Sequence, residues 1–143
     1  STCYLPETQP VYRAVARVLR EGGLYISPHK SPVSLQADVK PSPGGYELIE
    51  PYYREGPLPP VSGSKHREEG TLEYLHRLEE LLGGMGRAGL AVGELLGPLH
   101  AELTAQPGSF GERSRYVAPY LRVKARRRGG TAQQTTPARL IVS

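Results

Sequence analysis

The chain has 143 residues, 38% hydrophobic and 22% charged, which is ordinary for one water-soluble domain or a part of one. No apolar run reaches the roughly 20 residues of a membrane-spanning helix, and the start STCYLPETQP has no secretory-signal pattern. The single cysteine, Cys3, excludes an internal disulfide, and with four scattered histidines it makes no metal site. We therefore expect a cytoplasmic protein with no metal and no membrane partner.

The net charge of +4 is concentrated near the C-terminus. Residues 122–128, RVKARRR, carry five positive charges, which leaves the rest of the chain at about −1. The first half of this basic run alternates like an edge strand, where Lys and Arg discourage aggregation. We therefore do not expect nucleic acid as a partner, although contact with phosphates is the alternative role of such a run.

In chain order, the first predicted elements are a loop, a helix and a strand. Residues 1–9 look like the end of a strand and a loop, with Thr8 as a candidate helix N-cap. A helix is predicted from residue 10 to residue 19, with a core face at i, i+4, i+7 and i+8 made of Val11, Val15, Val18 and Leu19. Gly22 and Gly23 end this helix, and residues 24–26 form a short apolar strand.

Residues 28–65 are rich in proline and glycine, so no long helix can run through them. Within this irregular arm, residues 46–53 are predicted to form one β-arm. The sequence PLPPV at 57–61 is predicted to be an extended strut.

A second helix is predicted over residues 68–88, with Thr71 as its N-cap and a core stripe of Leu75, Leu78, Leu82 and Met85. Residues 90–96 are predicted to form a strand. After a loop, residues 116–125 form a last strand that Pro119 places near an edge. We interpret residues 127–143 as a basic, disordered tail.

The order of these elements predicts the second half of an open α/β sheet. The sequences that suggest a family are VARVLREGG at 15–23, the opening residues 1–6, and the helix 72–88 that ends in RAGL. With strands at 93–98 and 116–126, this arrangement resembles the C-terminal half of a class I S-adenosylmethionine-dependent methyltransferase, type 11-like. The resemblance covers residues 1–126, with 28–65 as an inserted arm.

The resemblance implies a Rossmann-like methyltransferase sheet that ends in an antiparallel hairpin, S-adenosylmethionine as cofactor, and methyl transfer to a small-molecule acceptor. Family members hold the cofactor with a glycine-rich loop after their first strand, and no G-x-G-x-x-G run occurs here. The chain therefore looks N-terminally truncated and is expected to lack most of the cofactor site when alone.

Two strand carboxyl ends are the expected ligand positions. By resemblance, Ser1, Cys3 and Pro6 lie beside the cofactor, and Tyr4 and Lys30 beside the acceptor. His29 is the candidate base for the acceptor's proton, and the alternative is a solvated loop histidine. Alignment alone can also suffice for methyl transfer, in which case no base exists.

Two tyrosines of the arm, Tyr52 and Tyr53, are expected to cover the substrate, and the alternative is that they pack on their own arm. His76 is expected to be a packing residue. The alternative function is a non-catalytic methyltransferase-like interaction protein that associates with RNA through the basic run. The acceptor and the oligomeric state stay open.

Overall fold

The computed structural model describes residues 2–60 and 72–129. Its elements, in chain order, are η1 (Thr2–Tyr4), α1 (Gln9–Val18), β1 (Leu24–Lys30), α2 (Pro32–Gln36), η2 (Glu79–Gly83), α3 (Gly84–Arg87), β2 (Leu90–Leu96), α4 (Phe110–Arg113) and β3 (Tyr120–Arg127). The first of these, η1, is a 3₁₀ turn, and η2 is a π-helical turn that continues into α3.

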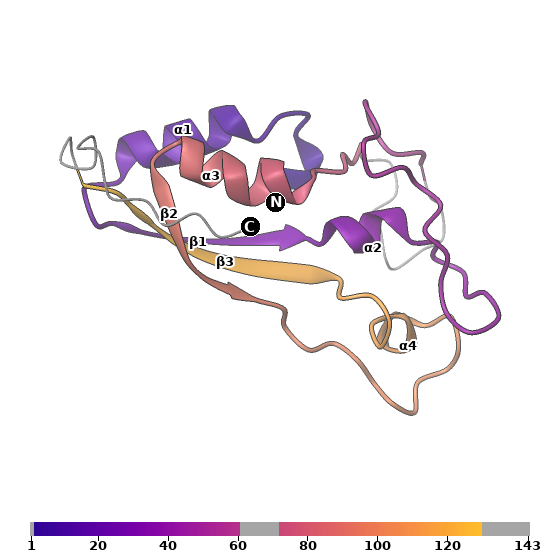
Figure 1. Cartoon of the computed structure of the whole chain (residues 1–143). Helices are drawn as coiled ribbons and strands as arrows, with labels where there is room; N and C mark the ends of the chain where they lie inside the picture. Colours follow the sequence, from indigo (N-terminus) through magenta and orange to yellow (C-terminus); the bar gives the residue numbers. More distant parts are fainter. Residues whose placement is uncertain (1, 61–71, 130–143) are drawn as a thin grey trace, which may run out of the picture.

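The three strands form one sheet in the order β1-β3-β2, and β3 is antiparallel to both neighbours. Strands β1 and β2 therefore point the same way, and β3, the last strand within the described residues, lies between them (Figure 1). The predicted α/β class with a final antiparallel strand pair is confirmed. The connection from β2 to β3 is much longer than a hairpin turn and contains α4.

Helices α1 and α3 cover one face of this sheet (Figure 1). The core between the helices and the sheet consists of Tyr12, Ala16, Met85, Leu90, Val123 and Ala125. On the opposite face the side chains of Leu24 and Ile26 are exposed. The sheet therefore has one packed face and one open face within the described residues.

The predicted core face of the first helix is only partly correct. Val15 and Leu19 pack against the core, but Val18 is 80% exposed. The fully buried residues of α1 are Tyr12 and Ala16, because the large Tyr12 ring sets the orientation of the helix on the sheet. The predicted glycine stop is present, since Gly22 has a left-handed φ of +77°.

The predicted second helix is shorter than the sequence indicates. Helical structure covers only residues 79–87, and Thr71 lies outside the described residues. Residues 72–78 are irregular because their polar groups bond to distant segments: Tyr74 N–H donates to Cys3 O, and Leu58 N–H donates to Glu73 O. These tertiary bonds outweigh the helical pattern of the sequence.

The predicted β-arm over residues 46–53 is wrong. This segment makes a single bridge, Leu48 to Ala37, and otherwise has no strand. The arm instead folds around a second apolar cluster of Leu35, Leu58 and Leu75. Ser109 caps the short helix α4 through its side chain, and the last strand begins four residues later than predicted, at Tyr120 after Pro119.

The arm is tied to α4 by Arg113, which is 2% exposed. Its guanidinium donates hydrogen bonds to the carbonyl oxygens of Ser34, Ala37 and Asp38 and to the Ser34 hydroxyl. Burial lowers the pKa of this guanidinium, and the surrounding carbonyls offset the cost of burying its charge.

Candidate functional site

The turn η1 packs against the carboxyl end of β1. The His29 cluster, as we name it, consists of Thr2, Tyr4, His29, Lys30, Glu73 and His76. It joins η1, the end of β1 and the segment before η2. In open α/β sheets ligands bind beyond the carboxyl ends of the strands, so this cluster lies where a ligand is expected.

His29 is 1% exposed, and its Nδ1 lies 2.9 Å from Thr2 Oγ1. The other ring nitrogen, Nε2, is buried with no hydrogen-bond partner among the described residues. Burial lowers the pKa of His29 to about 4, so the imidazole is neutral at pH 7. This residue is therefore not a solvated loop histidine, but a neutral ring with one unused nitrogen.

His76 holds η1 in place. Its Nε2–H donates to the carbonyl oxygens of Thr2, at 3.0 Å, and of Leu5, at 2.8 Å. The ring is 4% exposed, and its Nδ1 faces Glu80 Oε2 at 3.7 Å. The sequence analysis assigns His76 to packing, and the structure confirms it as a buried support for the turn that carries Thr2.

Lys30 is neutralised within the protein. Its Nζ lies 2.9 Å from the fully buried Glu73 Oε1 and 5.6 Å from the centre of the Tyr4 ring. The cluster therefore has an internally balanced pair of charges, and Lys30 has an anionic partner that the sequence did not reveal. The partner, Glu73, lies 43 residues away along the chain, in a segment predicted to be helical.

The structure brings only some of the predicted site residues together. Tyr4, His29 and Lys30 share the His29 cluster, and Cys3 is buried beside it in η1. Pro6 is exposed, and Ser1 lies outside the described residues. Sequence reasoning missed Thr2 and Glu73, because neither has a local pattern that marks it.

The two tyrosines of the arm belong to a different neighbourhood. Tyr52 packs against the second apolar cluster, and its hydroxyl accepts a hydrogen bond from Leu78 N–H. Tyr53 is 71% exposed, with the Arg77 guanidinium 5.0 Å from its ring centre. Among the described residues, no hydrogen bond or ring contact joins either tyrosine to His29.

Two further observations bear on the class of site. Within residues 2–60 and 72–129, no group of three or more His, Cys, Asp or Glu side chains could hold a metal ion. In the same ranges, every helix is too short or too polar to cross a bilayer.

Comparison with known proteins identifies solved structures that share the fold of this chain. No protein-family sequence model matches the chain, and no curated protein sequence matches it. A solved S-adenosylmethionine-dependent methyltransferase from Mesorhizobium loti aligns with a TM-score of 0.67 and 19% identity, over 89% of this chain and 58% of that chain. A structure from Listeria monocytogenes, which is provisionally assigned to the same class of enzyme, aligns with a TM-score of 0.60 and 11% identity. The alignment covers 90% of this chain and 58% of that chain.

These matches show that the chain has the fold of part of such a domain, since it spans 58% of the length of each structure. The methyltransferase-like sheet predicted from the sequence is therefore confirmed at the level of the fold.

Proposed function

We propose that this chain, which has the fold of part of a methyltransferase domain, takes part in S-adenosylmethionine-dependent methyl transfer to a small-molecule acceptor. The observation that carries the proposal is the match over 89% of the chain to a methyltransferase structure at a TM-score of 0.67. A fold hosts several functions, so the argument for chemistry rests on the His29 cluster at the carboxyl end of β1.

The residues of the cluster fit one end of such a site. The unpartnered, buried Nε2 of His29 is a polar atom that a bound group would satisfy. S-adenosylmethionine, when bound, supplies an electrophilic methyl group on a sulfonium. Following the resemblance, we propose Cys3 and Pro6 for the cofactor side of the cluster, and Tyr4 and Lys30 for the acceptor side.

His29 is proposed to take the proton that the acceptor loses when its oxygen or nitrogen gains the methyl group. That role needs the tautomer in which Nδ1–H donates to Thr2 Oγ1 and Nε2 keeps its lone pair. Because burial holds the pKa near 4, the base form is fully populated at pH 7. Thr2 is then a positioning residue that sets the tautomer.

Tyr53 is proposed to cover the acceptor from the arm, with Tyr52 as the anchor that fixes its position. The two rings lie edge to face at 5.3 Å between centres, and Tyr52 is held by its bond from Leu78 N–H. An exposed aromatic ring on an anchored neighbour is suited to contact with an apolar or aromatic ligand.

The test is a titration with S-adenosylmethionine itself, followed by NMR of the ring signals of isotope-labelled histidines in the full chain. The chain has four histidines, so each can be assigned. We expect the chemical shifts of His29 to change as S-adenosylmethionine is added up to about 10 mM. This concentration range is that of a weak dissociation constant, as expected for part of a binding site.

His100 is the internal control, because its ring packs against Phe110 and Tyr120 and, among the described residues, makes no ring contact with His29. Its signals should stay unchanged. Absence of any His29 shift over the same range, or equal shifts at His29 and His100, would contradict the proposed site. The Thr2→Val variant should weaken the His29 response, whereas Arg122→Gln on the open sheet face should not.

A further inference from the structure

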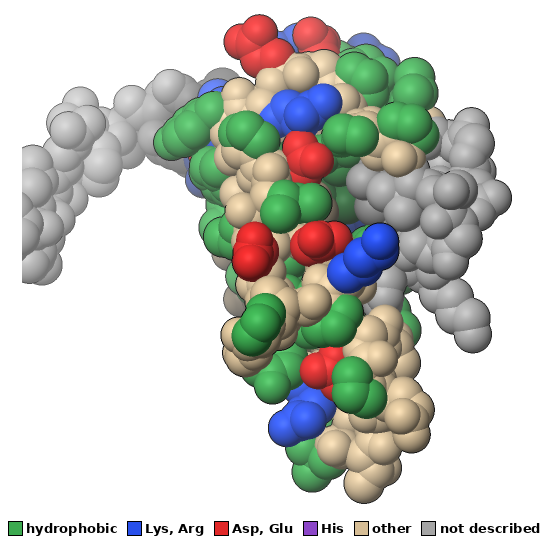
Figure 2. All heavy atoms as spheres, turned by 90° about the vertical axis from the view of Figure 1, so that its right-hand side faces the viewer, with side chains coloured by type: hydrophobic (Ala, Val, Ile, Leu, Met, Phe, Trp, Pro, Cys, Tyr) green, Lys and Arg blue, Asp and Glu red, His purple; other side chains and the backbone are tan. Residues whose placement is uncertain are grey.

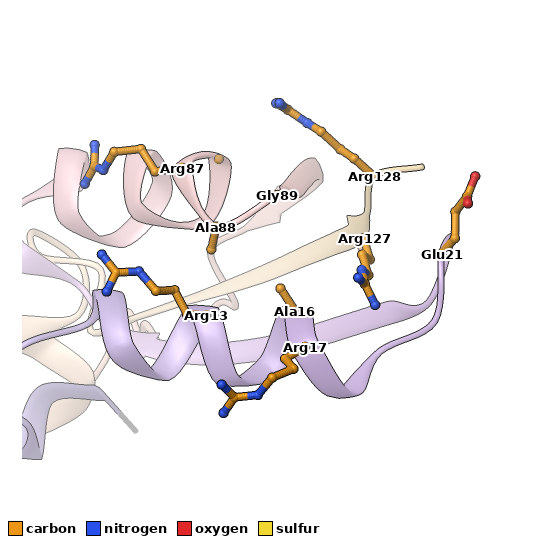
Figure 3. Close-up of a pocket in the computed structure, with 10 residues that line it drawn as sticks. Arg13, Ala16, Arg17, Glu21, Arg87, Ala88, Gly89, Arg127 and Arg128 are labelled. Atoms are coloured by element: carbon orange, nitrogen blue, oxygen red, sulfur yellow. The ribbon is translucent and has the colours of Figure 1, made fainter. Parts of the chain in front are cut away.

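A basic groove lies between the C-terminal parts of α1 and α3 and the end of β3. Its volume is about 780 Å³, and five arginines line it: Arg13, Arg17, Arg87, Arg127 and Arg128. Figure 3 shows that these side chains come from separate elements, with Arg13 and Arg17 on α1, Arg87 on α3, and Arg127 and Arg128 at the end of β3. The fold, and not a local run of sequence, assembles them.

The positive charge of the groove is largely uncompensated. Among the described residues of the lining, Glu21 is the one acidic side chain, against five arginines. Arg87 donates to Glu79 O, and Arg127 donates to Leu19 O, so both bond to carbonyls and not to carboxylates. Within the described residues Arg13, Arg17 and Arg128 have no ion pair.

The dipoles of α1 and α3 stabilise only some of the five arginines in the groove. Cations in the last turn of a helix are stabilised by its negative end, and Arg17 and Arg87 occupy such positions in α1 and α3. Arg13 lies earlier in α1, and the two arginines at the end of β3 belong to no helix. Gathering five cations in one groove costs repulsion energy unless an anion binds there.

The charges elsewhere are arranged differently. On the open face of the sheet, Lys124 pairs with Glu94 at 3.2 Å, and Arg126 donates to Gly22 O. On the side of the molecule shown in Figure 2, acidic, basic and apolar side chains are mixed. The strand alternation of β3 thus divides the basic run: Arg122, Lys124 and Arg126 face away from the helices, and only its last two residues reach the groove.

We propose that this groove binds the phosphodiester backbone of a single-stranded nucleic acid. Arginine presents a planar fork of donors that matches phosphate oxygens, and five of them along one groove suit several phosphates in series. No aromatic side chain lines the groove within the described part of the chain, so the bases are not stacked there. Binding is therefore independent of base sequence.

The groove is separate from the His29 cluster. It adjoins Glu21 and Gly89, which precede β1 and β2, whereas His29 lies at the carboxyl end of β1. At about 3.3 Å per residue, strand β1 puts the Glu21 end of the groove roughly 20 Å from His29, and His29 is not among the described residues that line the groove. The inference goes beyond the proposed methyl transfer and is tested without cofactor, so either can fail alone.

The experiment measures fluorescence anisotropy of a labelled single-stranded RNA of mixed sequence, with the full chain, over a range of salt concentrations. The test variant is Arg17→Gln/Arg128→Gln. The matched control is Arg115→Gln/Arg122→Gln, which removes the same charge from exposed positions outside the groove. We expect the test variant to weaken binding about tenfold and to reduce the slope of log K against log salt by about 1.4, at about 0.7 per lost phosphate contact.

A third variant, Glu21→Gln, removes the negative charge that the described lining contains and should tighten binding several-fold. Misfolding cannot produce such a gain. Equal weakening in the test and control variants, a Glu21→Gln variant that binds no better, or an affinity independent of salt would each overturn the proposal. Strong competition by inorganic phosphate at concentrations equal to the RNA would overturn it too, because a single-phosphate site would then explain the binding.

Discussion

Burial changes the protonation state of His29, and the residues that bury it come from distant parts of the chain. In the sequence, His29 follows a proline in a polar stretch, SPHK, where a solvated ring is the ordinary expectation. In the structure, the Tyr12 ring lies edge-on at 6.4 Å between ring centres, and Thr2 bonds its Nδ1. The result is an uncharged imidazole whose protonation state differs between the folded and unfolded chain.

That difference predicts a pH dependence of stability. The folded pKa near 4 lies below the unfolded value of about 6.5, so between these values the unfolded chain binds more protons. The contribution of His29 to the free energy of unfolding is complete above about pH 6.5. It falls by about 1.4 kcal/mol per pH unit as the pH drops toward about 4. Urea unfolding of the wild type should thus give a free energy about 2 kcal/mol lower at pH 5 than at pH 7 from this group alone.

The His29→Gln variant supplies the comparison, because every other titrating group stays in place. Its unfolding free energy should fall less between pH 7 and pH 5 than that of the wild type, whatever its absolute stability. Parallel pH profiles of the two proteins would show that His29 is not buried as a neutral ring.

At the scale of elements, the contact of α1 with α3 depends on a glycine. A Cβ atom on Gly84 would lie 3.2 Å from two ring carbons of Tyr12 and from Gln9 Oε1. Tyr12 is fully buried, so its ring has no free space into which to move. The glycine-rich stretch GGMG therefore weakens the helix locally but lets it approach α1 closely.

Two alanine substitutions, two residues apart, separate these effects. Gly84→Ala should destabilise the protein by about 1 kcal/mol or more, because the new methyl group overpacks the core. Gly86→Ala should stabilise it by up to about 1 kcal/mol, since nothing lies within 4 Å of the new Cβ and alanine favours helix. Thermal unfolding of both variants tests this, and shifts of the same sign would refute the close contact.

At the scale of the whole molecule, the sheet is packed on one face and open on the other. Val123 of the central strand β3 is 1% exposed beneath the helices, whereas Val92 of β2, which lies at an edge of the described sheet, is 40% exposed. A shallow hollow of about 460 Å³ lies on that open face, lined by Leu24, Val92 and Lys124 among others. Val123 and Val92 should therefore respond differently to the same substitution.

Replacement of valine by threonine keeps the shape and adds a hydroxyl. Val123→Thr should destabilise the protein by about 1–3 kcal/mol, because the hydroxyl is buried among apolar groups. Val92→Thr should change the unfolding free energy by no more than about 0.5 kcal/mol, because water reaches the new hydroxyl. Denaturant titration measures both free energies of unfolding, and comparable losses in the two variants would mean that the Val92 side chain is covered.

The features that depend on neighbours along the chain could be predicted from the sequence. The first helix, the Gly22 turn and the strand Leu90–Leu96 are set by short-range preferences and by the spacing of apolar residues. The α/β fold class followed from their order. Among the site residues, His29 and Lys30 could be singled out because they come shortly after the apolar run 24–26, at the carboxyl end of the strand that this run begins.

Tertiary contacts decided the rest, because they join residues far apart in sequence. Tyr12, and not Val18, faces the core since its ring packs between α3 and the sheet. Residues 72–78 leave the helix because Tyr74 and Glu73 bond to Cys3, Leu58 and Lys30. The five arginines of the groove are spread over 116 positions of the chain, Arg13 to Arg128, and only folding of α1, α3 and β3 against one another brings them together.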